Sequence, residues 1–190
     1  VVFHADIESD AGRFTMDDVC DGVVKKLLFR HPHVFGDGHE DSPESVLVSW
    51  DKLKRREKGQ KTVADSMDSV ARSLPSLWRA EKLQKKAAAA GFEWPDVQGA
   101  LDKLEEEVAE LRRAVENGGD VPDELGDVLF AAVKVGRFCG CDPEDAVNGT
   151  CEKFIHRFRA VEEGAAARGR EVSQLSLEEM TALWNEAKRS

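Results

Sequence analysis

The chain has 190 residues and a formal net charge of −10 at pH 7. This length allows one ordinary domain or two small ones, and 41% hydrophobic with 34% charged residues is typical of a globular protein with an apolar core. Because an acidic protein repels a polyanionic backbone, the charge argues against long DNA or RNA as a partner.

No targeting or membrane signal is evident. No apolar run approaches the ~20 residues of a membrane helix, and nothing resembles a signal peptide. We therefore predict a cytoplasmic protein without a membrane partner. The four cysteines lack the spacing of a zinc site, so we expect plain buried thiols: Cys20, Cys139, Cys141 and Cys151. Because Val1 resembles the middle of an apolar element, we expect a fragment of a longer protein.

Helix signals dominate and predict an all-α fold. The first predicted helix follows the capping residue Thr15 and ends near Arg30. A second begins at Ser42-Pro43, with proline in the first helical position. A third covers about residues 77–90 and ends at Gly91, which can adopt a left-handed cap.

The C-terminal half continues with longer helices. Residues 95–116 carry an apolar stripe at 3-4-3-4 spacing, made of Leu101, Leu104, Val108, Leu111 and Val115. A further helix covers about residues 122–138, and another opens at Asp142-Pro143. Ser176 and Glu179 fit a capping box for the last helix.

Two features divide the chain. Residues 57–74 are charged, lack apolar periodicity and are predicted to form a linker. In addition, an internal repeat appears at an offset of 127 residues, which predicts two related helical units. It pairs Val1–Phe3 with Val128–Phe130, and matches Asp18 with Asp145, Gly22 with Gly149, Lys26 with Lys153, and Arg30 with Arg157.

Two acid-x-x-acid pairs are the strongest functional signal. Glu107 and Glu110 form the first pair, and Glu124 and Asp127 form the second. Residues at i and i+3 share one part of a helix surface, and the short turn at 117–121 permits an antiparallel hairpin that brings both pairs together. Clustered carboxylates repel each other without a cation, and Mg²⁺ prefers such oxygen ligands. A solvated acidic helix face is the alternative.

The second pair is harder to explain as a solvated face. Between Leu125 and Val135 the polar side chains are Asp127 and Lys134, and a buried carboxylate is unfavourable unless it is paired or metal-bound. Gly126, beside it, lowers helix stability by about 1 kcal/mol relative to alanine. This combination indicates a site.

These motifs resemble the MazG family, whose signature is Glu-x-x-Glu, a spacer, and Glu-x-x-Asp. The resemblance covers essentially the whole chain and extends over the segments 103–111, 123–130 and 153–158, the joining stretches 30–35 and 72–77, and residues 91–94. One departure is Cys151, where the family often has asparagine; this puts a polar contact from that position in doubt.

The resemblance implies an all-α, four-helix-type core with additional helices, assembled as a homodimer. It also implies hydrolysis of nucleoside triphosphates to nucleoside monophosphate and pyrophosphate. By analogy with tandem members, residues 1–56 would be the remnant of an N-terminal MazG-like unit, 57–74 the linker and 75–190 the catalytic unit.

The same resemblance implies roles for individual residues. Glu107, Glu110, Glu124 and Asp127 would hold Mg²⁺, for which Mn²⁺ can substitute, and a water would attack the α-phosphorus. In one variant of this scheme Glu107 takes the proton of that water instead of binding metal. The expected substrate contacts are Lys153 and Arg157 on the phosphates, Trp184 on the base, and Lys188 and Lys85 at the pocket. Surface charges and a core tryptophan are the alternatives for these residues.

Two other readings of the sequence stay open. The first is a related all-α hydrolase specific for dUTP or dCTP, or a phosphoribosyl-ATP pyrophosphatase, which share the acidic chemistry. The second is a non-catalytic dimerisation or regulatory module. Release of pyrophosphate from a panel of nucleotides with Mg²⁺ distinguishes all of them.

Overall fold

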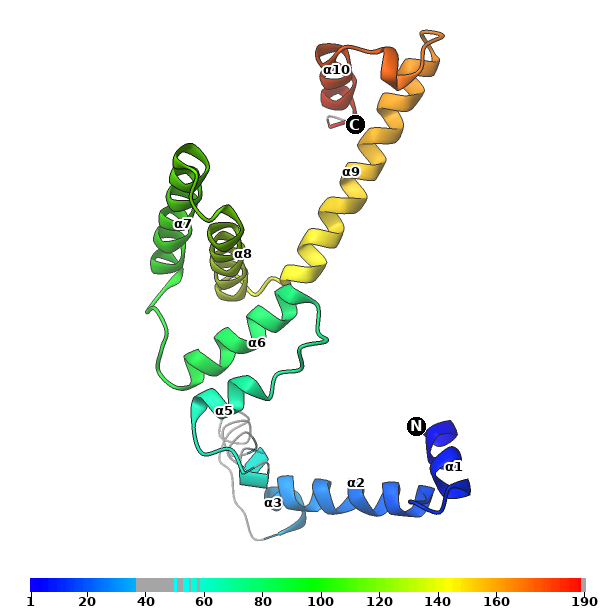
Figure 1. Cartoon of the computed structure of the whole chain (residues 1–190), viewed down its shortest axis with the longest axis vertical. Coiled ribbons are helices and arrows are strands. Elements are labelled where there is room, and N and C mark those ends of the chain that lie inside the picture. Colours follow the sequence, from blue (N-terminus) through cyan, green and yellow to red (C-terminus); the bar gives the residue numbers. More distant parts are fainter. Residues whose placement is uncertain (37–49, 51–52, 55, 58, 189–190) are drawn as a thin grey trace. The chain divides into compact units, whose positions relative to one another are not determined.

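The computed structural model describes residues 1–36, 50, 53–54, 56–57 and 59–188. Within these ranges the regular elements are helices and no strand occurs, which confirms the all-α prediction (Figure 1). The chain divides into two units, Val1–Ser69 and Val70–Ser190. Among the described helices, none is both long and apolar enough to cross a membrane. The helix predicted from Ser42-Pro43 lies outside the described residues.

The N-terminal unit contains α1 (Val2–Asp10), α2 (Met16–Arg30), α3 (Pro32–Phe35) and α5 (Val63–Asp68). The predicted start and end of α2 are confirmed. Thr15 caps this helix through a reciprocal box, in which its side chain accepts from the Asp18 N–H while the Asp18 carboxylate accepts from the Thr15 N–H at 2.8 Å. Helix α1 packs on α2.

Helix α5 lies inside the segment that the sequence predicts as a linker. Its N-terminus is also closed by a capping box, because the Thr62 N–H donates to the Asp65 carboxylate at 2.8 Å and the Asp65 N–H donates to the Thr62 hydroxyl at 3.0 Å. Six residues are too few to show an apolar period, so the sequence pattern does not predict this helix.

The C-terminal unit contains six described elements, and each predicted helix is present with its ends close to the prediction. They are α6 (Ser76–Ala89), α7 (Val97–Asn117), α8 (Val121–Phe138), α9 (Pro143–Ala166), the 3₁₀ turn η1 (Val172–Gln174) and α10 (Leu177–Ala187). Helices α7 and α8 form an antiparallel hairpin, α6 packs against α8, and α10 folds back on α9 (Figure 1).

Local caps account for these boundaries. Side chains accept hydrogen bonds from the first-turn N–H groups of α7, α8, α9 and α10; they belong to Asp96, Asp120, Asp142 and Ser176. Gly118 ends α7 in the left-handed region at φ +73°, where a side chain would be strained. The hairpin that carries both acidic pairs is therefore closed by a glycine turn.

The sequence repeat has a structural counterpart. Thr15 caps α2 and Asp142 caps α9, and these two positions are 127 residues apart, the offset of the repeat (142 − 15). In both units a helix ends, a short turn follows and a capped helix begins at the equivalent position. The α1–α2 pair thus matches α8–α9 in local structure as well as in sequence.

The prediction of buried cysteines is wrong, because all four thiols are free and exposed. Cys20 and Cys151 lie on surfaces of α2 and α9, and Cys139 and Cys141 lie in the turn between α8 and α9. Thiols are often buried as small apolar groups in protein cores, but these four positions lie at helix surfaces and in a turn.

Candidate active site

The α7–α8 hairpin brings three of the four predicted acids together. Glu107 projects from α7, and Glu124 and Asp127 project from α8. One carboxylate oxygen from each residue lies within 4.8 Å of the other two. The i, i+3 spacing of the α8 pair and the antiparallel packing of α7 are what place these groups on one surface.

The three carboxylates differ in exposure. Glu107 is buried at 6% relative exposure, Glu124 is half-buried and Asp127 is exposed, so the cluster opens to solvent on the Asp127 side. Burial raises the pKa of Glu124, and the negative charges of Glu110, Asp123, Asp127 and Glu107 raise it further. This repulsion is the electrostatic condition that a bound cation relieves.

Glu110, the fourth predicted acid, points elsewhere. Its carboxylate accepts a hydrogen bond from the Arg113 guanidinium at 2.9 Å, one turn further along α7. It does not belong to the group of converging oxygens, although its charge acts on Glu124. Rotation of this half-buried side chain away from Arg113 is the movement needed for it to join the cluster.

Lys103 also lies at the acidic cluster, although the sequence motif predicts no role for it. Its ammonium lies 2.7 Å from Glu107 Oε1 and 2.9 Å from Glu106 Oε1, and these contacts raise the pKa of Lys103. The signal was present in the sequence as a Lys–Glu pair four residues apart. Lys103 places a positive charge directly beside the cluster and holds the buried Glu107 carboxylate in place.

The donor set fits a hard divalent cation. All three converging groups are carboxylates, the ligands that Mg²⁺ and Mn²⁺ share. Three carboxylates around one point also supply the excess negative charge that makes cation binding favourable at neutral pH.

A second group of predicted site residues lies on α9 and α10. The Arg157 guanidinium carbon is 5.7 Å from the centre of the Trp184 ring, within cation–π distance. Phe154 also packs on Trp184, with ring centres 5.0 Å apart. Lys153 is exposed one turn before Arg157, and Lys188 is the C-cap residue of α10.

These basic residues are not joined to the acids within this chain. Lys85, on α6, pairs with Glu81 at 2.6 Å. Among the described residues, no hydrogen bond or ion pair links Lys85, Lys153 or Arg157 to any of the four acids. The structure therefore shows two separate groups, an acidic cluster on α7–α8 and an aromatic–basic group on α9–α10.

Contacts behind α8 fix the helix that carries Glu124 and Asp127. The Glu93 carboxylate binds the buried Lys134 ammonium at 2.6 Å and also Arg137, and the Lys134 ammonium lies 5.1 Å from the centre of the Trp94 ring. Burial lowers the pKa of Lys134. Trp94 thus has a packing role, and these contacts hold α8 to the segment that precedes α7.

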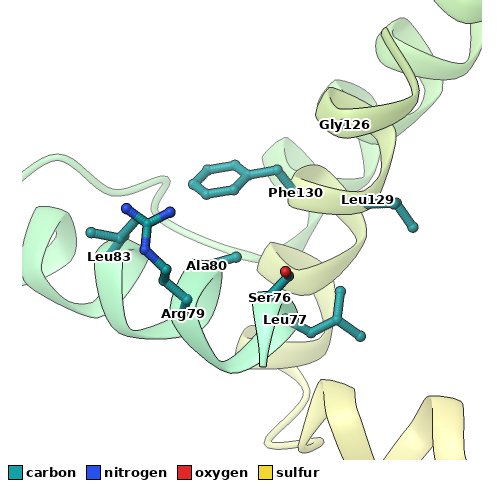
Figure 2. A pocket seen from close by; sticks show the side chains of 8 residues that line it. All are labelled: Ser76, Leu77, Arg79, Ala80, Leu83, Gly126, Leu129 and Phe130. Atoms are coloured by element: carbon teal, nitrogen blue, oxygen red, sulfur yellow. The ribbon is translucent and has the colours of Figure 1, made fainter. Parts of the chain in front are cut away.

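Helix α6 supports the opposite side of α8. The Gln84 amide donates to the Phe130 carbonyl at 2.7 Å. Beside this contact, an apolar pocket lies between the two helices, lined by Leu77, Leu83, Leu129 and Phe130 with Arg79 at its edge (Figure 2). Gly126, next to Asp127 in sequence, faces this pocket, and a Cβ added there would meet open space.

Comparison with known proteins finds a family match that includes the α7–α8 hairpin. The model of the MazG nucleotide pyrophosphohydrolase domain matches residues 1–35 and 96–161. The nucleoside triphosphate pyrophosphohydrolase of Escherichia coli K12 is 40% identical over 193 aligned residues, which cover the whole chain and 73% of that relative.

Two further relatives extend this comparison. The nucleoside triphosphate pyrophosphohydrolase/pyrophosphatase MazG of Thermotoga maritima is 37% identical over 188 residues, covering 99% of the chain and 71% of the relative. The uncharacterized protein YabN of Bacillus subtilis is 43% identical over the whole chain, which spans 39% of its length. With the acidic hairpin inside the matched residues, the chain belongs to the MazG nucleotide pyrophosphohydrolase family.

Proposed function

We propose that this chain hydrolyses nucleoside triphosphates to the monophosphate and pyrophosphate in a reaction that requires Mg²⁺. The observation that carries the proposal is the convergence of Glu107, Glu124 and Asp127 within 4.8 Å on the α7–α8 hairpin of a MazG-family chain. The relatives from E. coli and T. maritima bear names that describe this activity.

The acidic residues have distinct tasks in this proposal. Glu107, Glu124 and Asp127 hold the cation, with Glu110 as a fourth ligand after it leaves Arg113. When bound, Mg²⁺ or Mn²⁺ supplies Lewis acidity toward phosphate oxygens and acidifies water. Lys103 orients Glu107 and places positive charge where phosphate oxygens approach the cluster.

The residues on α9 and α10 bind the substrate. Lys153 and Arg157 are separated by one helical turn and neutralise phosphate charge. Trp184 offers an aromatic face to a base, and its contact with Arg157 places a base-binding and a phosphate-binding group side by side. Lys188 and Lys85 are proposed as further contacts at the rim of the substrate site.

We also propose that the chain forms a homodimer. Several large apolar side chains remain exposed on α8 and α9, among them Leu125, Leu129, Phe130, Phe154, Ile155 and Phe158. Large exposed apolar side chains that gather on one surface are typical of interaction sites. A molar mass of twice 21.0 kDa by light scattering at micromolar concentration is the expected result, and a monomer at all concentrations contradicts it.

The domain division is part of the same proposal. Residues 1–56 are the remnant of an N-terminal MazG-like unit, residues 57–74 are the linker, and residues 75–190 are the catalytic unit. The repeat supports this division, because the α1–α2 pair matches α8–α9, whereas the converging carboxylates in the described part of the chain belong to α7 and α8.

Product analysis tests the proposed reaction. Purified chain is incubated with one nucleoside triphosphate and Mg²⁺, and the products are separated by ion-exchange chromatography. Monophosphate and pyrophosphate in equal amounts support the proposal; diphosphate and orthophosphate refute it. EDTA should stop the reaction, and added Mg²⁺ or Mn²⁺ should restore it.

A substrate panel separates the related alternatives. Comparable rates with several ribo- and deoxynucleotides support a general pyrophosphohydrolase. Activity confined to dUTP or dCTP, or to phosphoribosyl-ATP, assigns the chain to one of the specific relatives. The absence of pyrophosphate from every nucleotide, by a folded chain with Mg²⁺, supports the non-catalytic module.

A further inference from the structure

We propose that Cys139 and Cys141 form a dithiol site that exchanges with a small disulfide and closes into an intrachain disulfide across Gly140. The site lies in the turn that joins α8 to α9. Its reaction partner is a low-molecular-weight disulfide such as oxidised glutathione. This inference is independent of the proposed hydrolase activity.

The local backbone presents both thiols on one tight turn. Cys139 is the C-cap residue of α8, and Gly140 follows in the left-handed region at φ +67°. The turn is closed by two hydrogen bonds, from the Gly140 N–H to the Arg137 carbonyl at 3.3 Å and from the Cys141 N–H to the Gly136 carbonyl at 2.9 Å. Both cysteines are free and exposed, so a solution disulfide can reach either sulfur.

The spacing of the two residues suits a disulfide. A stretch of two residues spans at most about 7 Å when fully extended, which is close to the ~4.4–6.8 Å that disulfides bridge between Cα atoms. The Cys141 sulfur already lies 3.7 Å from the Cys139 carbonyl oxygen. The second thiol therefore lies close to the backbone of the residue that carries the first.

The intrachain disulfide forms in two thiol–disulfide exchange steps. The Cys139 thiolate attacks one sulfur of oxidised glutathione, forms a mixed disulfide and releases one glutathione thiolate. The Cys141 thiolate then attacks the Cys139 sulfur, forms the Cys139–Cys141 bond and releases the second glutathione thiolate. The two protons of the protein thiols end on the two glutathione molecules; the protein is oxidised by two electrons and glutathione disulfide is reduced.

Either thiol can start this sequence, because both are exposed. The resulting loop is small and solvent-accessible, and exposed disulfides are the readily reduced ones. Dithiothreitol should therefore reopen it. Cys20 and Cys151 lack a second cysteine within a few residues of sequence and serve as internal references.

Peptide mapping of the full chain tests the site. Reduced protein is incubated with oxidised glutathione, and remaining thiols are alkylated with iodoacetamide. The chain is then cleaved on the N-terminal side of aspartate, which places Cys151 on a different peptide from Cys139 and Cys141, and the peptides are analysed by mass spectrometry without reduction. We expect the peptide with Cys139 and Cys141 to have lost two hydrogen atoms and to carry neither glutathione nor the alkyl group. After dithiothreitol, the same peptide should take up two alkyl groups.

Two variants test whether each of the two thiols resolves the mixed disulfide formed on the other. In Cys139→Ser and in Cys141→Ser the remaining thiol has no partner, so stable glutathione adducts should accumulate at that position. Cys151→Ser is the control and should form the loop as the wild type does. A wild-type chain that keeps glutathione on either residue, leaves both open to alkylation, or links them to Cys20, Cys151 or another copy would overturn the proposal.

Discussion

The α1–α2 pair and the α8–α9 pair have the same local design and different surroundings. Each consists of a helix, a short turn and a second helix whose cap lies at the equivalent position, Thr15 in one and Asp142 in the other. Helix α8 packs along α7 and gains Glu107 as a third converging acid. In the described residues of the first unit, no helix supplies an equivalent acidic partner to α1.

The matching arginines show the same divergence. Arg30, the counterpart of Arg157, binds the Glu57 carboxylate at 2.6 Å and lies 5.5 Å from the centre of the Trp50 ring. Arg157 contacts an aromatic ring, Trp184, and no carboxylate within the described part of the chain. The helix pair is therefore a scaffold, and the chemistry depends on which partner helices and side chains surround it.

Removing an acid from the α7–α8 hairpin should have the largest effect. Asp127→Ala is expected to lower kcat/KM by roughly 100-fold or more, since the cation contributes several kcal/mol to transition-state stabilisation. Helical content by circular dichroism should stay close to wild type, because Asp127 is exposed. Glu116→Ala, on the exposed end of α7, is the matched control; equal activity in both variants would remove Asp127 from the site.

The two matching arginines offer the next test. Arg157→Ala should lower kcat/KM by about 10- to 100-fold, since hydrogen bonds to charged groups contribute about 1.5–3 kcal/mol. Arg30→Ala should leave kcat/KM within about twofold while it releases Glu57, because Arg30 pairs with Glu57 and not with the acidic cluster. A similar loss in both variants would mean that the first unit takes part in phosphate binding.

Two glycines of α9 should respond to alanine with opposite signs. A Cβ at Gly164 would lie 2.4 Å from Leu183 Cδ2, so Gly164→Ala overpacks the α9–α10 core and should destabilise the chain by about 1–3 kcal/mol. A Cβ at Gly149 meets no atom within 4 Å, so Gly149→Ala should stabilise α9 by up to about 1 kcal/mol. Urea unfolding of the two variants measures both. Stabilisation by Gly164→Ala would show that α10 does not pack as described.

The smallest expected difference is between the caps at Thr15 and Asp142, and it concerns the pH dependence of stability in acid. Backbone N–H donation from Asp145 lowers the pKa of Asp142 most, and the Trp78 indole at 2.8 Å lowers it further. The stabilisation from the ionised cap is fully present above the ordinary pKa of 3.8 and disappears as the pH falls through the lower folded value. Asp142→Asn should therefore reduce the fall of Tm at pH values below about 3.8.

Trp78→Phe provides the control for this pH effect. It removes the indole N–H and keeps the backbone donors, so the acid-sensitive part of the curve should shrink without vanishing. Thr15→Ser at the equivalent position should change the curve very little, since the Asp18 carboxylate that titrates in that cap remains. An unchanged curve for Asp142→Asn would contradict the assigned origin of the shift.

Helix boundaries were the most predictable part of the molecule. Thr15, Asp142 and Ser176 form caps whose hydrogen bonds reach only two or three residues along the chain. Gly118 ends a helix because of its own backbone freedom. The spacing within each acidic pair is equally local, so the positions of Glu107, Glu124 and Asp127 on their helices followed from the sequence.

The partner that each charged side chain selects, and the burial of each residue, could not be predicted in this way. Glu110 turns to Arg113 although its spacing matches that of its neighbours, and Lys134 is buried beside Glu93 although both are charged. The cysteines of the α8–α9 turn are exposed against the usual preference of thiols. Each outcome depends on which side chain of another segment, or of the next turn, competes for the group.

By itself, the sequence determined the helices, their caps, the repeat and the candidate acids, because hydrogen bonds and periodicity within one segment decide those features. The tertiary structure alone decided that α7 and α8 bring Glu107 to Glu124 and Asp127, and that Arg157 meets Trp184. The physical reason is range: a cap is satisfied within one turn, whereas a converging set of charges exists only after separate helices have packed.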